Sequence, residues 1–150
     1  MGATIEFYAG DPAALARCYD IEDIDQHLAC RSGFPMADFS FHLAPFEDLD
    51  SLLQCLKAEG LNLPDEFEEL MVEELWSDGD EWIPATLHRL DDRLTAVARL
   101  DDAAHRRVAA RWWPEWQGEE HIPEALAALS EVARQAEQPG WELMFYLYPG

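Results

Sequence analysis

Both ends of the chain carry short runs that favour extended backbone. Residues 4–8 alternate polar with apolar side chains and include β-branched and aromatic ones, and residues 141–148 form a dense β-forming run. Between them, Phe39, Phe41 and Leu43 alternate with polar residues, a pattern typical of a half-buried strand. The sequence therefore predicts a small sheet of about three strands that includes both chain ends.

Helical spacing is clearest in residues 45–59. Four leucines recur there at i, i+3, i+4 and i+7, and so share one helix face: Leu49, Leu52, Leu53 and Leu56. Gly60 follows, at a position where helices commonly end. The same spacing predicts further helices over residues 12–18, 20–28, 101–112 and 123–137. In the second of these, Ile24 and Leu28 are expected to point inward.

Residues 63–76 also predict a helix, which Pro64 would open. Its apolar stripe would consist of Phe67, Leu70, Met71 and Leu75. Three of its acids would stand at i, i+4 and i+8, with Glu66 beside them: Asp65, Glu69 and Glu73. Like charges at this spacing repel each other, so the row is either a solvated face or a surface that meets cations.

Residues 86–99 allow two interpretations. Five apolar residues fit a helix, whereas Asp91 and Asp92 could form the turn of a hairpin; the helix matches more positions. With this helix the fold class is α+β, about six helices packed on the small sheet. A length of 150 residues suits a single globular domain, 1–150. The alternative is an acidic lobe, 1–84, beside a less charged lobe, 85–150.

The distribution of charge changes the picture most. Residues 1–84 hold 20 acidic and three basic side chains, a net charge of −17, whereas residues 85–150 hold 11 acidic and seven basic ones, a net of −4. A total of −21 repels nucleic acid and anionic membranes and speeds association with cationic surfaces. A hydrophobic content of 49% still permits a folded core, and no apolar run is long enough to cross a membrane. The expected partner is a basic protein.

The cysteines are odd in number and lie in no metal-binding spacing: Cys18, Cys30 and Cys55. Cys18 and Cys55 fall beside apolar helical positions, so we expect them to be small buried side chains with a structural role, and we expect no pairing of the cysteines. Unpaired cysteines are typical of a reducing compartment. The sequence therefore predicts a cytoplasmic protein.

No motif for catalysis, a cofactor or a metal is present. The histidines lie in no ligand spacing and are expected to be exposed: His27, His42, His88, His105 and His121. No serine lies in a nucleophile elbow, and no glycine-rich phosphate loop occurs. We therefore expect no catalytic residue, no cofactor and no metal, and an enzyme is not favoured.

Two surfaces are candidates for binding. The loop after residue 112 carries Trp113 and Trp116, whereas Trp112 falls on an apolar helix face; exposed tryptophans often anchor partners. The acidic row supplies the rest of the predicted partner-binding set: Asp65, Glu66, Glu69, Glu73, Trp113 and Trp116. Six arginines within residues 89–111 could pair locally, or could dock against the acidic half within one chain or in a homodimer.

These observations favour a non-enzymatic acidic protein that captures a basic protein, such as an immunity or antitoxin-type inhibitor of a nuclease. Such an inhibitor competes for the cationic groove that the nuclease presents to phosphate. One alternative is a small enzyme or ligand-binding domain with a pocket near Trp112–His121. Another is a structural or adaptor subunit that buries the tryptophan loop in an oligomer.

Overall fold

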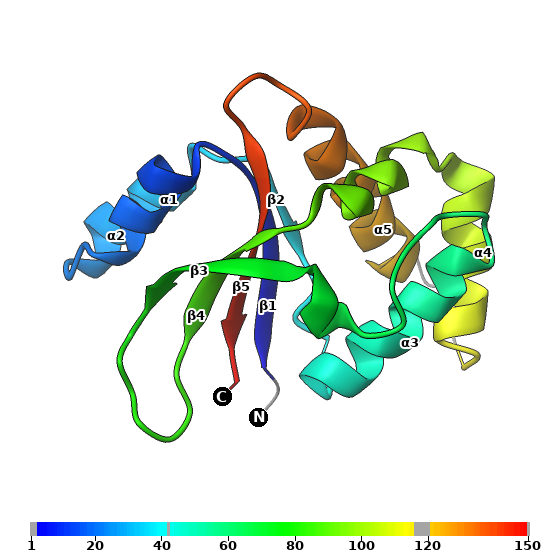
Figure 1. Ribbon diagram of the computed structural model, residues 1–150, viewed down its shortest axis with the longest axis horizontal. Helices are drawn as coiled ribbons and strands as arrows, with labels where there is room; N and C mark the ends of the chain where they lie inside the picture. Colours follow the sequence, from blue (N-terminus) through cyan, green and yellow to red (C-terminus); the bar gives the residue numbers. More distant parts are fainter. Residues whose placement is uncertain (1–2, 42, 116–120, 150) are drawn as a thin grey trace.

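A five-stranded antiparallel sheet organises the described residues, which are 3–41, 43–115 and 121–149 of the computed structural model. The strand order is β2-β1-β5-β4-β3, and helices flank the sheet on two sides (Figure 1). Along the chain the elements are β1 (Thr4–Gly10), α1 (Pro12–Tyr19), α2 (Ile24–Arg31), β2 (Met36–Asp38), α3 (Pro45–Lys57), the 3₁₀ helix η1 (Phe67–Leu70), β3 (Met71–Ser77), β4 (Thr86–Leu90), the 3₁₀ helix η2 (Asp92–Arg99), α4 (Asp102–Trp112), α5 (His121–Gln135) and β5 (Glu142–Tyr148).

The two chain ends lie side by side, as predicted. β1 and β5 pair antiparallel over their full lengths, from Thr4 opposite Tyr148 to Gly10 opposite Glu142. The α+β class is also confirmed. The prediction of about three strands was an undercount, because β3 and β4 lie in segments that were assigned to helices.

Alternate residues of the central strands enter two separate cores. Ile5, Phe7 and Phe145 belong to the larger core, which α3, α4 and α5 complete. Tyr8 and Met144 belong to a smaller core under α1. Figure 1 shows α1 and α2 on one side of the sheet and α3, α4 and α5 on the other. Strands that are apolar on both faces are typical of the middle of a sheet.

The helix predicted over residues 63–76 is wrong. Phe67 and Leu70 are buried in η1, where a spacing of three residues suffices, and residues 71–77 form edge strand β3. The pairing of β3 with β4 shifts between Met71 and Glu73 and again between Glu74 and Trp76. Each irregularity adds a residue to the strand, so the twofold alternation that marks a strand in sequence is lost.

Residues 86–99 are neither a single helix nor a hairpin turning at Asp91. Thr86–Leu90 is β4, which lies between β3 and β5, and Asp92–Arg99 is η2. Leu94 and Val97 are buried three residues apart, a spacing that serves a 3₁₀ helix as well as an α-helix.

Two smaller predictions also need correction. The strand beside β1 is Met36–Asp38 rather than residues 39–43, although the Phe39 N–H still donates to Ile5 O at 2.8 Å; His42 is outside the described residues. α2 buries none of its side chains, and Ile24 is 65% exposed and Leu28 44% exposed. α2 is attached instead through its C-terminal half, where His27 Nδ1 lies 2.6 Å from Cys18 O, Cys30 forms a disulfide and Arg31 pairs with Glu6.

A disulfide joins α1 to α2. Cys18 and Cys30 are bonded, with their Cα atoms 5.5 Å apart, whereas Cys55 is a free, buried thiol. Burial of Cys18 and Cys55 agrees with the prediction, but the expectation of three unpaired cysteines is wrong. The prediction of a cytoplasmic protein rested on unpaired cysteines and is no longer supported by them; it stays a prediction. No described helix is long and apolar enough to cross a membrane.

Candidate functional site

The predicted acidic row does not form, because its members lie on three different elements. Asp65 lies in the loop before η1 and pairs with Lys57 of α3. Glu66 and Glu69 cap η1, with the Glu66 N–H donating to Glu69 Oε2 at 3.4 Å. Glu73 lies on β3 and pairs with Arg89 of β4 at 3.0 Å. These carboxylates serve local structure, and their role in partner binding stays a prediction.

The predicted tryptophan loop is described only in part. Trp112 is buried, and its Nε1 donates to Asp48 O at 3.0 Å. Trp113 is half-buried and meets the Trp112 ring edge-on, with ring centroids 5.8 Å apart. Trp116 is outside the described residues, and so is much of the segment of the alternative pocket near Trp112–His121. Trp113 therefore lies between core and surface.

The arginine-rich half docks against the acidic half within one chain. Arg107 and Arg111 of α4 donate to opposite oxygens of Glu59, at 2.7 and 2.6 Å. The Glu59 side chain is only 8% exposed. Hydrogen bonds from the two guanidinium groups lower the pKa of Glu59 to about 2. This carboxylate connects the end of α3 to α4. Because both of its oxygens already pair with arginines of the same chain, it is a poor candidate for partner binding.

The most exposed large apolar side chain of the described residues lies, beside a second exposed one, in the loop between β3 and β4, which we call the tip loop (residues 78–85). Trp82 is 89% exposed and Ile83 is 52% exposed. Figure 1 shows the tip loop in green, extending beyond the sheet and away from α3, α4 and α5. Neighbouring exposed apolar residues are typical of interaction sites in folded proteins.

Hydrogen bonds to acidic side chains set the conformation of the tip loop. Asp80 Oδ1 accepts from the N–H groups of Trp82 and Ile83, at 2.8 and 3.0 Å. These two backbone N–H groups lower the pKa of Asp80, because they stabilise its charged form. Asp78 Oδ1 accepts from the Asp80 N–H at 2.9 Å, and the Asp78 N–H closes the loop on Ala85 O.

The tip loop is also acidic. Asp78, Asp80 and Glu81 precede the two apolar residues, and no lysine or arginine occurs between Lys57 and Arg89. Sequence reasoning selected Trp113 and Trp116 as the candidate binding tryptophans and did not select Trp82. The signal was available in the run of turn-forming Asp and Gly immediately before a tryptophan.

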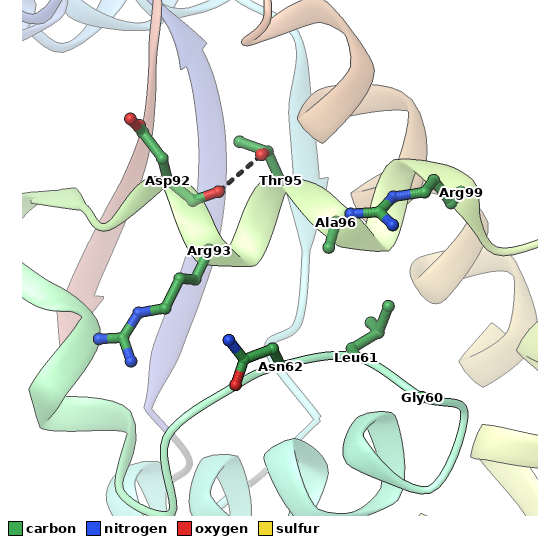
Figure 2. Close-up of a pocket in the computed structure, with 8 residues that line it drawn as sticks. All are labelled: Gly60, Leu61, Asn62, Asp92, Arg93, Thr95, Ala96 and Arg99. Carbon is green, nitrogen blue, oxygen red and sulfur yellow. Dashed lines mark hydrogen bonds between the residues drawn. The ribbon is translucent and has the colours of Figure 1, made fainter.

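A second candidate is a shallow polar pocket of about 290 Å³ between η2 and the loop after α3 (Figure 2). Arg93, Ala96 and Arg99 recur every three residues and so share one face of this 3₁₀ helix, opposite Asn62. Arg93 is already paired with Asp91 at 3.1 Å. Exposed arginines at an open surface hold anions weakly, and no function is assigned to this pocket.

A buried histidine and serine form a pair that has no access to substrate. Ser130 Oγ donates to Val97 O at 2.7 Å and lies 2.8 Å from His105 Nε2, which therefore carries the proton of that contact. Both residues are buried, which corrects the expectation of an exposed His105. His88 is half-buried, and burial lowers the pKa of both histidines. The pair stabilises the packing of η2 on α4 and α5.

Among the described residues, no three histidine, cysteine or acidic side chains are arranged to hold a metal ion.

Of the sites described above, the tip loop has the clearest physical basis, because it presents two exposed apolar side chains on a backbone that the Asp80 carboxylate fixes. Comparison of the chain with protein-family models, with curated proteins and with solved structures finds no match in any of the three.

Proposed function

We propose that this protein is a non-enzymatic binding protein that captures a basic protein partner through the tip loop. The observation that carries the proposal is the exposure of Trp82, 89%, on a loop whose backbone is held by Asp80. Exposed tryptophan has a large apolar area to lose on binding, and interface hot spots are enriched in it. A fixed loop also loses less conformational entropy when it binds.

The charge of the chain supports a basic partner. The tip loop places three carboxylates beside Trp82, in a molecule of net charge −21. Such a field accelerates encounter with a cationic surface and discriminates against acidic proteins and nucleic acid. We infer a partner that offers an apolar pocket with a basic rim.

An immunity or antitoxin-type inhibitor of a nuclease is the form of this function that fits best. A nuclease presents a cationic groove to phosphate, and an acidic loop that ends in Trp82 and Ile83 could fill that groove. The inhibitor itself needs no catalytic residue, cofactor or metal. In this proposal the acidic residues Asp65, Glu66, Glu69 and Glu73 contribute to steering, whereas the tip loop supplies the specific contact.

The test uses a photo-crosslinking phenylalanine analogue in place of Ile83 in the native cell. A matched chain carries the analogue in place of Met36, which is also exposed but lies on the opposite edge strand, β2. Position 83 is expected to crosslink to a basic protein and position 36 is not. The purified pair is expected to bind more weakly as salt rises from low to physiological concentration and above, because salt screens charges at the rim.

Three outcomes would overturn the proposal: crosslinking only to neutral or acidic proteins, equal crosslinking from both positions, or binding that does not depend on salt. Crosslinking from position 83 only to a second copy of the chain would instead support the adaptor alternative, in which the protein uses the tip loop to form an oligomer.

A further inference from the structure

An ion pair lies at the floor of a cavity on the α1–α2 side of the sheet, away from the tip loop. Arg31, the last residue of α2, donates through Nη1 to Glu6 Oε1 of β1 at 2.9 Å. Tyr8 and Ser32 line the same cavity, whose volume is about 320 Å³. This volume lies at the lower end of the range for pockets that bind small molecules.

The ion pair keeps unused binding capacity towards the cavity. Tyr8 Oη also donates to Glu6 Oε1, at 2.9 Å, so both hydrogen bonds reach the same oxygen. Glu6 Oε2 accepts none from the described residues and is not sealed from solvent. The side chains of Arg31 and Glu6 remain 21% and 11% exposed. A ligand in the cavity can therefore reach both charges.

Tyrosines fix the polarity of the floor. Burial is the main cause that raises the pKa of Tyr8, and it likewise raises the pKa of Tyr146 to about 12. Both phenols are therefore neutral at physiological pH. Tyr19 stacks on Tyr146 with ring centroids 4.8 Å apart, and both pack with Tyr8 in the smaller core. The charges that a ligand meets are those of Glu6 and Arg31.

The walls of the cavity are apolar. Leu28, Phe34 and Met36 line it, and Leu28 and Met36 are exposed despite their size. Phe34 packs directly over Gly10, where an added Cβ would lie 2.5 Å from the Phe34 ring. Glycine at position 10 thus lets the Phe34 ring lie close against β1. Covering these walls with an apolar ligand group would remove exposed hydrocarbon from water, which is favourable.

We propose that this cavity binds a free α-amino acid with an apolar side chain. The ammonium group would contact Glu6 Oε2, the carboxylate would contact Arg31, and the side chain would lie against Leu28 and Met36. The floor carries one charge of each sign, so a zwitterion offers an opposite charge to both, whereas a ligand with a single charge can make a charge-assisted contact with only one of them. Hydrogen bonds between such charged groups are stronger than neutral ones.

Calorimetric titration of the intact protein with L-leucine, L-methionine and L-phenylalanine tests this proposal. N-acetyl-leucine and leucinamide are the matched ligands, because each lacks one of the two charges. We expect the free amino acids to bind and each derivative to bind at least about tenfold more weakly, since each derivative lacks one of the two charge-assisted contacts with the protein. Amide resonances of Ser32 and Gly33 are expected to shift with the free amino acid, and those of the tip loop are not.

Variants of α2 separate a ligand site from a purely structural ion pair. Leu28 and Ile24 lie one turn apart on the same exposed helix face, but only Leu28 lines the cavity. Leu28→Ser is expected to weaken leucine binding about tenfold, the usual effect of losing part of an apolar pocket, and Ile24→Ser is expected to leave it unchanged. Failure of all three amino acids to bind at several millimolar, or equal binding of leucine and its two derivatives, would overturn the proposal. Equal effects of the two variants would also overturn it.

Discussion

The Asp80 carboxylate accepts a hydrogen bond from the backbone N–H of Trp82 at 2.8 Å, and this contact holds the most exposed indole of the described residues in solvent. The same oxygen accepts from Ile83 at 3.0 Å. One acidic side chain therefore organises the backbone of both exposed apolar residues. We therefore expect the conformation in which Trp82 and Ile83 are exposed to depend on Asp80.

Asp80→Ala is expected to loosen the tip loop without unfolding the protein. Loss of two hydrogen bonds at an exposed site removes order locally, and the affinity for the basic partner is expected to fall several-fold. Fluorescence anisotropy of the tryptophans, with calorimetry of the complex, measures both effects. Glu81→Ala is the control, since it removes the same charge from the same loop without a backbone hydrogen bond. If the two variants behave alike, charge rather than loop order is what matters.

Truncation of tryptophans should separate surface from core. Trp112→Ala is expected to lower the free energy of unfolding by about 3–5 kcal/mol, the range for a buried aromatic side chain, whereas Trp82→Ala is expected to change it by less than about 0.5 kcal/mol. Chemical denaturation monitored by circular dichroism gives both numbers. Iodide should quench the emission of the parent chain more strongly than that of Trp82→Ala. A large loss of stability in Trp82→Ala would place its side chain in the core.

Glu59→Gln should destabilise the junction between α3 and α4. Two arginines lose their charged acceptor, for which about 1.5–3 kcal/mol is the usual loss. The pKa of Glu59 is lowered to about 2 from 4.5, so the stability it contributes is present above pH 4.5 and is lost as the pH falls towards 2. The difference between parent and variant is therefore expected to shrink in acid. Glu131→Gln, which removes an exposed pair with Arg134, is expected to cost less than about 0.5 kcal/mol; a cost as large as that of Glu59→Gln would contradict this account.

His105 predicts a second, milder dependence on pH. Burial holds its pKa below 6.5, so the histidine is neutral in the folded chain and takes up a proton more readily when unfolded. Its contribution to stability is complete above pH 6.5 and is lost as the pH falls towards the lowered value. His105→Gln should reduce the slope of unfolding free energy against pH in this window. Parallel curves for parent and variant would show that His105 does not titrate as its burial implies.

Local patterns sufficed where one element buries one regular face. The four leucines of residues 45–59 and the apolar runs of β1 and β5 predicted their elements directly. The strand β3 was not predicted because its two register shifts interrupt the alternation of buried and exposed side chains. The 3₁₀ helix η2 was not distinguished from an α-helix because buried residues three positions apart fit both kinds of helix. For β3 the pairing partner, β4, decides the structure, and this partner is not visible in the local sequence.

Sites depend still more on long-range packing. α2 is attached through His27, Cys30 and Arg31, and Ile24 and Leu28 stay exposed. The pairing of Glu6 with Arg31 joins residues 25 positions apart. The total charge and the turn before Trp82 could be read from the sequence. The burial of Trp112 could also be predicted, because it falls on an apolar helix face. That Trp82 is far more exposed than Trp113 could not, because Trp113 packs against a core built from residues distant in sequence.

The central claim, that the tip loop captures a basic protein, is tested most directly by the affinity of the crosslinked partner for matched variants. Trp82→Ala is expected to cost at least about 2 kcal/mol of binding free energy, the scale of a hot-spot aromatic residue. Ile83→Ala is expected to weaken binding, whereas Ile24→Ala, the same change at another exposed isoleucine, is expected to leave it unchanged. Unchanged affinity in Trp82→Ala, with the fold intact, would contradict the account.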